Sequence, residues 1–471
     1  MQLADVRRID NEIDEWIENR RDEIVAKMQE LIRIPSVLGE PAPGAPFGRE
    51  SLRALEFVRD LCNDYGLPTK IVDGYAMHAE VGQGDRLIGV LSHVDVVPAG
   101  EDWTYDPFGA QLDDGKIYGR GAIDDKGPAI ASLYALFVLK QLGVSLSSRI
   151  RAIIGADEET GFRCVKYYFT QEEMPDIGFT PDGSFPAIYA EKGIATPIIQ
   201  SRIPDVSGPI KLVEMRAGVR SNMVPDRAFA RLQGTDSALR DASDRIKGDG
   251  ITVELDKESV VVRAVGVSAH ASTPNEGVNA VGLLTRALID SNILSSLNKW
   301  LDVLYYYATD TTGRPLGIAA VDEITGSLTS SLGIVATQDG KLSATFSVRY
   351  PVTWKGDAIQ EKIGTQVAGQ GFELIEFNDS PPLYVPEDDP LITTLVGVYR
   401  ELTGDDTPIK TMGGGTYARA LKKGVAFGAS FPGFPDIAHK ADEFWYVDDL
   451  ILSTRIYARS LARLAASNEA N

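Results

Sequence analysis

Apolar positions in the first 195 residues switch between helical spacing and short buried runs. Residues 5–32 carry apolar side chains at near-helical intervals, which predicts an amphipathic helix ending before Pro35. Further along, LIGVLSHVD and RIRAIIGADEE are typical of buried strands, and the GPAIASLYALFVLKQLG segment between them is helical. This alternation predicts an α/β domain with a mostly parallel central sheet flanked by helices.

The pattern changes after about residue 194. Shorter strands of alternating polarity follow, among them VEMRAGV, TVELD, SVVVRAV and KLSATFSVRYPV, together with helical segments such as VNAVGLLTRALIDSN. The pattern of the first domain resumes near Pro382. We therefore expect a discontinuous domain made of residues 1–195 and 381–471, interrupted by an inserted α+β domain at residues 196–380.

The composition of the chain argues against some kinds of binding partner. The chain has 471 residues, and 47 Lys and Arg stand against 67 Asp and Glu, a formal net charge of −20. Such an acidic balance argues against nucleic acid and against an anionic membrane as partners. No apolar run reaches the ~18 residues of a membrane span. Two cysteines and a charged N-terminus without an apolar signal segment favour a cytoplasmic protein.

Histidine is scarce, with four residues at positions 78, 93, 270 and 439. His93 and Asp95 end a predicted buried strand, and alternation places them on the same side, where the carboxylate can accept the second N–H of a metal-bound imidazole. The alternative is a strand-end histidine that bonds to solvent. His78 fits no motif and is expected to be a structural strand residue.

Acidic residues follow several of the predicted strands. Asp124 and Asp125 open a helix, Glu158 and Glu159 follow a buried strand, and Asp182 lies in a turn. Each alone could be a helix cap or a solvated turn. Taken with His93 and His439, however, Asp124, Glu159 and Asp182 provide nitrogen and oxygen ligands without cysteine. That mixture suits Zn²⁺ or Mn²⁺ in a two-metal hydrolytic site.

The motifs at these residues resemble those of a known family. They are SHVDVVP, GRGAIDDKGP, ADEETG, TPDGSFP, VSAHASTP and IAHKADE. In this order they are similar to the co-catalytic metallopeptidases, which include carnosinase, the glutamate carboxypeptidases, aminoacylase and succinyl-diaminopimelate desuccinylase. The DPFGAQLDDGKIYGRGAIDDKGP, EKGI and GGGTYAR segments most resemble the bacterial peptidase V-type, or Xaa-His, dipeptidases.

The resemblance implies a site with two divalent ions, Zn²⁺ first and Mn²⁺ or Co²⁺ as alternatives. Asp124 would bridge the ions and Asp95 would orient a histidine ligand, while Glu158 would be the general base. The terminal ligands would be His93, Glu159, Asp182 and His439.

The resemblance also assigns the inserted domain as a lid. Its His270 would stabilise the oxyanion, and Arg349 would suit a substrate carboxylate. Other substrate contacts would come from Asn222, Gly413, Gly414, Gly415 and Thr416. Because the insertion is long, one chain would supply His270 and Arg349 itself, so we expect a monomer.

The function that follows is a metal-dependent dipeptidase, which hydrolyses short unblocked peptides with a bridging metal-bound hydroxide. A desuccinylase, an N-acyl-amino-acid deacylase or a carboxypeptidase of the same family is the nearest alternative. A metal-binding regulatory protein without activity is a further one, although the complete ligand set and Glu158 argue against it.

Overall fold

The chain forms two structural units. In the computed structural model, which describes residues 3–205 and 208–466, the first unit comprises Met1–Tyr189, Leu383–Thr411 and Gly415–Asn471. The inserted unit comprises Ala190–Pro382 and Met412–Gly414. The sequence placed the borders after residues 195 and 380. The short Met412–Gly414 segment of the inserted unit was not anticipated.

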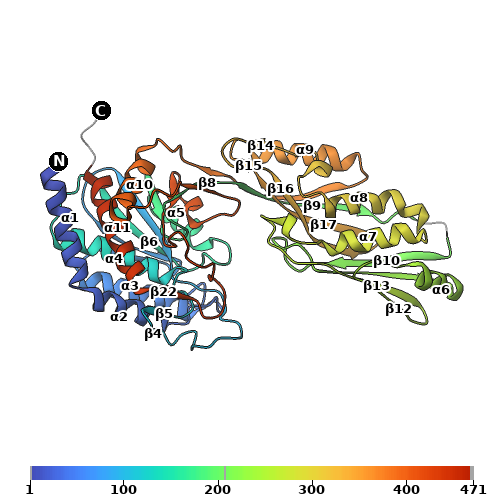
Figure 1. Ribbon diagram of the computed structural model, residues 1–471, viewed down its shortest axis with the longest axis horizontal. Helices are drawn as coiled ribbons and strands as arrows, with labels where there is room; N and C mark the ends of the chain where they lie inside the picture. The colour runs from blue at the N-terminus through green and yellow to red at the C-terminus, as the bar shows by residue number, and fades with distance from the viewer. Residues whose placement is uncertain (1–2, 206–207, 467–471) are drawn as a thin grey trace. The chain divides into compact units, whose positions relative to one another are not determined.

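A mixed nine-stranded sheet forms the centre of the first unit (Figure 1). Its strands lie in the order β1 (Thr69–Val72), β2 (Ala76–Val81), β6 (Arg149–Gly155), β3 (Leu87–His93), β7 (Ile177–Thr180), β21 (Gly424–Ala426), β8 (Ile188–Glu191) and β19 (Leu383–Tyr384), with β20 (Lys410–Met412) beside β8. Strands β6, β3, β7 and β21 are parallel to one another. The pairs β1–β2, β2–β6 and β21–β8 are antiparallel.

The expectation of a mostly parallel sheet therefore holds only at its centre. Strands β1 and β2 form a hairpin, because Asp73 and Gly74 between them adopt positive φ angles of 49° and 76°. A connection this short reverses the chain direction, whereas a parallel pair needs a long crossover.

Helices supply the remaining core of the first unit. They are α1 (Leu3–Glu18), α2 (Arg21–Ile32), α3 (Arg49–Asp64), α4 (Lys126–Gln141), α5 (Arg163–Gln171), α10 (Pro390–Thr403), α11 (Val447–Ala466) and the 3₁₀ helix η4 (Tyr417–Ala420). Every residue of α4 from Lys126 to Leu139 is buried, since this helix packs between α11, α2 and strands β3 and β6.

The single helix expected over residues 5–32 is two helices. A turn at Asn19 and Arg20 separates them, and Arg20 has non-helical dihedral angles (φ −116°, ψ 12°). Its guanidinium lies 3.9 Å from the ring centroid of Trp16. The apolar positions continue across the turn, since Ile17 and Ile24 are both fully buried, so apolar spacing alone did not reveal the break.

The two faces of β3 meet different neighbours. The Ser92 hydroxyl lies 3.5 Å from that of Ser132 on α4. Side chains alternate along a strand, so His93 points to the opposite face. There its ring packs edge-on against Tyr417 of η4, with centroids 6.0 Å apart. The site residues at the end of this strand therefore lie on the face away from α4.

A separate three-stranded sheet completes the first unit. It consists of β22 (Phe444–Tyr446), β5 (Lys116–Tyr118) and β4 (Gln111–Asp113), in that order. Strand β5 leads into the turn before α4, and β22 follows the loop that carries His439. Their antiparallel pairing, Phe444 with Tyr118 and Trp445 with Ile117, brings these two distant segments together.

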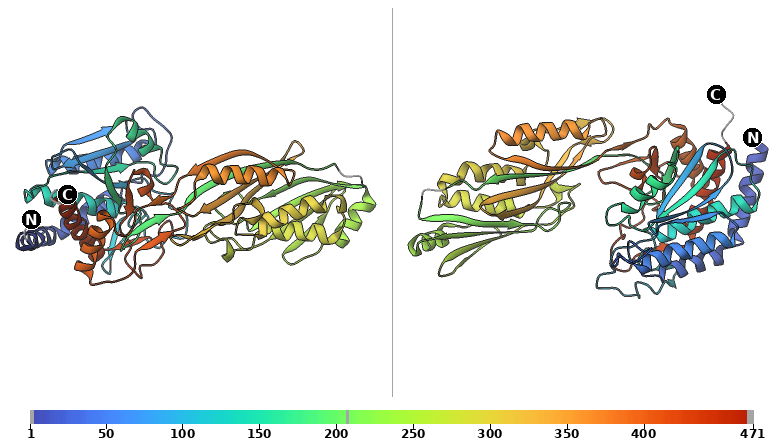
Figure 2. Two further views of the ribbon diagram at one scale, coloured as in Figure 1. Left: turned by 90° about the horizontal axis from the view of Figure 1, so that it is seen from above. Right: turned by 180° about the vertical axis from the view of Figure 1, so that it is seen from behind.

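The inserted unit is an eight-stranded antiparallel sheet with helices on one face (Figures 1 and 2). The strand order is β12 (Ile251–Leu255), β13 (Ser259–Val265), β11 (Arg227–Gly234), β10 (Ile210–Ala217), β16 (Thr329–Gln338), β17 (Lys341–Tyr350), β9 (Gly193–Arg202) and β18 (Glu373–Ser380). Burial alternates residue by residue along most of β9, which is the pattern of a sheet covered on one face only.

The helices on this sheet are α6 (Asp236–Arg245), α7 (Ala280–Ser291), α8 (Asn298–Thr309) and α9 (Gly356–Ala368), with the 3₁₀ helices η1 (Pro274–Glu276), η2 (Ser295–Leu297) and η3 (Arg314–Leu316) and the hairpin β14 (Val321–Asp322) and β15 (Gly326–Ser327). Tyr307 is buried in the core with Phe346 and Phe372. No helix in the described ranges is both long and apolar enough to cross a membrane.

His78 belongs to a polar network on the edge strands of the first unit. Its Nδ1 lies 2.8 Å from the Tyr168 hydroxyl, and only 9% of the residue is exposed. Burial, followed by the positive charge of Arg151, lowers the pKa of His78 to about 4. The other charged neighbours are Glu172 and Glu80, which oppose the shift, and Lys70, which adds to it.

The lowered pKa of His78 predicts a pH-dependent stability. In the unfolded chain histidine binds a proton near pH 6.5, whereas folded His78 does so only near pH 4. Acid therefore favours the unfolded chain, and His78 should cost about 1–2 kcal/mol of stability between pH 7 and pH 5. His78→Gln should lose less thermal stability over this interval than the wild type, both measured metal-free. An equal loss in the two proteins would contradict the prediction.

Candidate metal centre

The candidate ligands lie where neighbouring parallel strands end. His93 is the last residue of β3, Glu159 follows β6, and Asp182 follows β7. Because β6, β3 and β7 are adjacent and parallel, their carboxyl ends share one edge of the sheet, where ligands of such sheets bind. Asp124 joins them from the turn before α4, and its peptide bond to Asp125 is cis.

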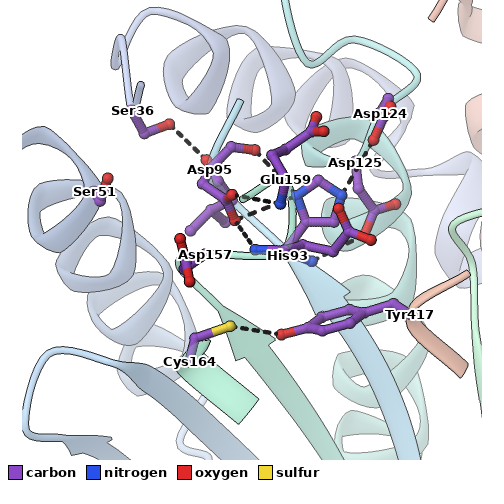
Figure 3. A network of polar contacts seen from close by, with 12 residues as sticks. Ser36, Ser51, His93, Asp95, Asp124, Asp125, Asp157, Glu159, Cys164 and Tyr417 are labelled. Atoms are coloured by element: carbon purple, nitrogen blue, oxygen red, sulfur yellow. Dashed lines mark hydrogen bonds and ion pairs between the residues drawn. The ribbon is translucent and has the colours of Figure 1, made fainter. Parts of the chain in front are cut away.

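Asp124 is the residue that connects the two histidines. Its Oδ1 lies 3.1 Å from Nε2 of His93, and its Oδ2 lies 2.9 Å from Nε2 of His439. Nε2 of His439 also lies 3.0 Å from Oε1 of Glu159, and Nε2 of His93 lies 4.0 Å from Oδ2 of Asp182. The structure thus brings all five predicted ligands together, and Figure 3 shows His93, Asp124 and Glu159 within this network.

The backbone at Asp95 fixes the proton position on His93. Nδ1–H of His93 donates to the Asp95 backbone carbonyl at 3.0 Å. A carbonyl only accepts, so the neutral ring carries its hydrogen on Nδ1 and presents the lone pair of Nε2 to the cluster. The Asp95 carboxylate, expected to orient the ring, lies farther from Nδ1, at 3.5 Å.

The Asp95 carboxylate also holds the turn after β6. One oxygen accepts the backbone N–H of Glu158 at 3.0 Å, and the other accepts that of Glu159 at 3.1 Å. The same turn is fixed from its other side by Asp157, whose carboxylate binds the Arg163 guanidinium at 2.7 Å. Both glutamates are therefore presented from a rigid backbone.

The crowding and burial of Glu158, Glu159 and Asp182 disfavour their charged forms. Burial raises the pKa of Asp182 to about 7, and the neighbouring Asp124 charge adds to the shift. Burial likewise raises the pKa of Glu159, and it raises the pKa of Glu158 well above the ordinary range. These shifts mean that the cluster is short of positive charge.

The pKa values of the two imidazoles are raised as well, which favours their charged forms. Hydrogen bonds, first to Asp124 and then to Glu159, raise the pKa of His439 to about 10. For His93, burial disfavours the charged ring, but hydrogen bonds to Asp124 and Asp95 outweigh it and raise the pKa well above the ordinary value. Protons on the two histidines thus supply part of the charge that a cation would supply.

The cluster suits divalent cations because it is short of positive charge. Two overlapping groups each bring three ligand atoms within 4.8 Å of one another, His93 with Asp124 and Glu159, and His93 with Glu158 and Asp182. Their donors are imidazole nitrogen and carboxylate oxygen, the set that Zn²⁺ and Mn²⁺ accept. Glu158, expected to be a base, lies close enough to belong to the second group.

A second cluster of predicted residues forms within the inserted unit. The Ser272 backbone N–H donates to Nδ1 of His270 at 3.2 Å, and the Ser272 hydroxyl lies 2.6 Å from the same nitrogen. Burial and then the charge of Arg349 lower the pKa of His270. Because Nδ1 accepts the Ser272 N–H, the neutral ring of His270 carries its hydrogen on Nε2. Asn222 accepts the Ala271 N–H through its backbone carbonyl at 2.9 Å.

The loop from Gly413 to Thr416 is divided between the two units. Gly413 and Gly414 belong to the inserted unit, and a Cβ at Gly413 would lie 3.4 Å from Cβ of Ser272. Gly415 and Thr416 belong to the first unit, where the Thr416 hydroxyl caps η4 by accepting the Ala418 N–H at 3.2 Å.

Sequence reasoning missed several residues around the centre. Tyr417 packs against His93, and its hydroxyl lies 3.0 Å from the Cys164 sulfur (Figure 3). Arg120 and Glu443 form a buried pair between the segments of Asp124 and His439. Both stand inside recognisable motifs, GRGAIDD and HKADE, but a sequence does not reveal which motif residues face each other.

The first unit thus combines a mixed sheet with a histidine–carboxylate cluster where its parallel strands end, and an inserted unit interrupts its sequence. Residues 89–463 match Peptidase family M20/M25/M40, and the chain belongs to this family. The resemblance to co-catalytic metallopeptidases and the expected hydrolase class are thereby confirmed.

Curated relatives match along nearly the whole chain. "Putative dipeptidase YtjP" of Bacillus subtilis (strain 168) is 42% identical over 456 residues, which is 95% of this chain and 98% of the relative. "Putative dipeptidase MW1694" of Staphylococcus aureus (strain MW2) is 34% identical over 466 residues, 96% of this chain and 98% of the relative.

Solved structures share the fold at low identity. The dipeptidase Dug1p from Saccharomyces cerevisiae matches with a TM-score of 0.58 at 14% identity, covering 98% of this chain and 99% of its own. Human carnosine dipeptidase 1 matches with a TM-score of 0.56 at 16% identity, covering 97% and 99%. The expected architecture, an α/β domain with an insertion, is confirmed.

Asp124→Asn should impair binding at both ends of the cluster. The variant keeps the side-chain shape but loses the charge that contacts both histidines, so both ions should bind more weakly. We expect at least one of two Zn²⁺ equivalents to be lost when the protein is dialysed against a weak chelator and its metal is counted. Asp176→Asn, at an acid that accepts the Leu87 N–H at 2.8 Å, is the matched control. Full occupancy in Asp124→Asn would contradict the assignment.

Proposed function

We propose that this protein is a metal-dependent dipeptidase that cleaves short unblocked peptides. The observation that carries the proposal is the contact of one carboxylate, Asp124, with both His93 and His439, which suits a bridge between two ions. The relatives named "Putative dipeptidase", which match nearly the whole chain, support the choice of substrate.

Two divalent ions would be held by the five clustered residues. His93 and Asp182 would bind one, Glu159 and His439 the other, and Asp124 both. We propose Zn²⁺, with Mn²⁺ or Co²⁺ as alternatives, because these ions accept imidazole nitrogen and carboxylate oxygen. When bound, such ions act as Lewis acids and make water acidic enough to attack near neutral pH.

Glu158 is proposed to handle the proton of the reaction. It lies beside the ligand Glu159, and its backbone N–H is fixed by Asp95 at 3.0 Å. Its carboxylate would take a proton from the attacking water and return it to the leaving amine. A carboxylate held by the turn rather than by a flexible loop keeps one geometry for both transfers.

His270 is proposed to stabilise the developing oxyanion. The Ser272 backbone N–H occupies Nδ1, so Nε2–H is the donor that remains for substrate. A neutral donor suits the role, because it adds a hydrogen bond where negative charge develops. Arg349, a guanidinium that can bind a carboxylate through two parallel hydrogen bonds, would hold a substrate terminus together with Asn222 and the loop from Gly413 to Thr416.

We also propose that the protein works as a cytoplasmic monomer. Its two cysteines, Cys62 and Cys164, are buried and free of disulfides, as in proteins of a reducing compartment. The inserted unit spans Ala190–Pro382, an insertion long enough that one chain would supply His270 itself.

The substrate class is tested by an assay of metal-depleted and reloaded protein. EDTA-treated enzyme should be inactive, and Zn²⁺, Mn²⁺ or Co²⁺ should restore hydrolysis of free dipeptides. N-acetylated forms of the same dipeptides should not be cleaved. Preferential cleavage of N-acyl substrates would instead identify a deacylase or desuccinylase, and no hydrolysis with any of the metals would leave a binding protein.

Glu158→Gln should separate catalysis from metal binding. Loss of a general acid–base group typically costs about 10²–10⁴-fold in rate, or ~3–5 kcal/mol of barrier, so kcat should fall by this amount. Metal content should equal that of the wild type. Glu173→Gln, at a half-exposed glutamate paired with Arg149, should keep full activity. Near-normal turnover in Glu158→Gln would exclude Glu158 as the base.

A further inference from the structure

A buried ion pair of the first unit contacts the segments that carry Asp124 and His439. Nη1 of Arg120 donates to Oε2 of Glu443 at 2.6 Å, and the two side chains are 1% and 0% exposed. Arg120 follows β5 and Glu443 precedes β22, so the pair connects segments that are 323 positions apart. Burying two charges is costly, and their other contacts indicate what they do.

Arg120 holds the backbone of the His439 loop. Its Nη2 donates to the His439 carbonyl at 3.2 Å, and its Nη1 donates to the Lys440 carbonyl at 3.2 Å. A further bond from Nη2 to the Ala99 carbonyl, at 3.1 Å, fixes the guanidinium itself. Only arginine offers this planar fork of donors, which a lysine ammonium does not reproduce.

The His439 backbone needs such support. His439 has a positive φ of 65°, a conformation that non-glycine residues seldom adopt and that persists where the surroundings impose it. Its side chain is 51% exposed, so packing around the ring does not fix its position. The bond from Arg120 to the His439 carbonyl acts on this strained residue directly.

Glu443 binds the backbone of the turn that carries Asp124. Its Oε1 accepts the backbone N–H of Ile123 at 3.1 Å and that of Asp124 at 3.3 Å. One carboxylate therefore contacts Arg120 through one oxygen and the Asp124 turn through the other. The chain of contacts runs from the His439 carbonyl through Arg120 and Glu443 to the Asp124 N–H.

We propose that Arg120 and Glu443 are positioning residues that set the placement of His439 relative to Asp124 and thereby the affinity for divalent ions. The inference rests on the metal centre of the proposed function, but not on its substrate. Groups behind metal ligands typically contribute 10–100-fold in metal affinity, which is the effect expected here.

The test compares metal affinity with stability. Arg120→Lys keeps the charge but loses the fork, so Zn²⁺ measured against a chromophoric chelator should bind 10–100-fold more weakly. Arg151→Lys is the matched control. Arg151, on β6, is also buried, and it pairs with Glu80 of β2 at 2.7 Å rather than with a residue of the metal centre. It should keep wild-type affinity while losing a similar amount of thermal stability in the metal-free protein.

A double variant covers the case in which Arg120→Lys does not fold. Arg120→Met with Glu443→Leu replaces the pair by apolar side chains, an exchange that often preserves or increases stability. Weakened Zn²⁺ binding in this folded protein supports positioning. Unchanged affinity in either variant overturns it. A wild-type protein without Zn²⁺ affinity would overturn the proposed metal centre as well, whereas two bound ions without dipeptidase activity would overturn only the proposed substrate.

Discussion

The structure depends on keeping several carboxylates together at one edge of a sheet. Asp124, Glu158, Glu159 and Asp182 come from three separate turns, and His93 and His439 bring compensating charge to them. The raised pKa values of Asp182 and His439, about 7 and about 10, express the same shortage of cations. The ends of the parallel strands and the buried Arg120–Glu443 pair hold these carboxylates close together, although like charges repel one another.

Much of the fold could be predicted, because the signals involved are local. Apolar runs bounded by turns located β3 and β6, and the change to alternating strands located the insertion. Other features depend on contacts between distant segments. The turn at Arg20 leaves the apolar spacing intact, and the antiparallel edge of the central sheet follows from the tight β1–β2 connection. Apolar periodicity is insensitive to both.

The candidate ligands could be predicted for a related reason. Residues at the carboxyl ends of adjacent parallel strands converge, so the positions of His93, Glu159 and Asp182 follow once the strands are known. The groups that orient these ligands do not follow. A backbone carbonyl is the nearest acceptor for His93, and no sequence signal marks a carbonyl. Arg120 and Glu443 become partners only when β5 pairs with β22.

We propose that the cluster is a two-ion centre joined by Asp124. The most direct measurement is anomalous diffraction from crystals of the Zn²⁺-loaded protein, recorded on both sides of the zinc absorption edge. We expect two anomalous peaks that share Asp124, one beside His93 and Asp182 and the other beside Glu159 and His439. A single peak, or peaks that leave Asp124 without a contact, would contradict it.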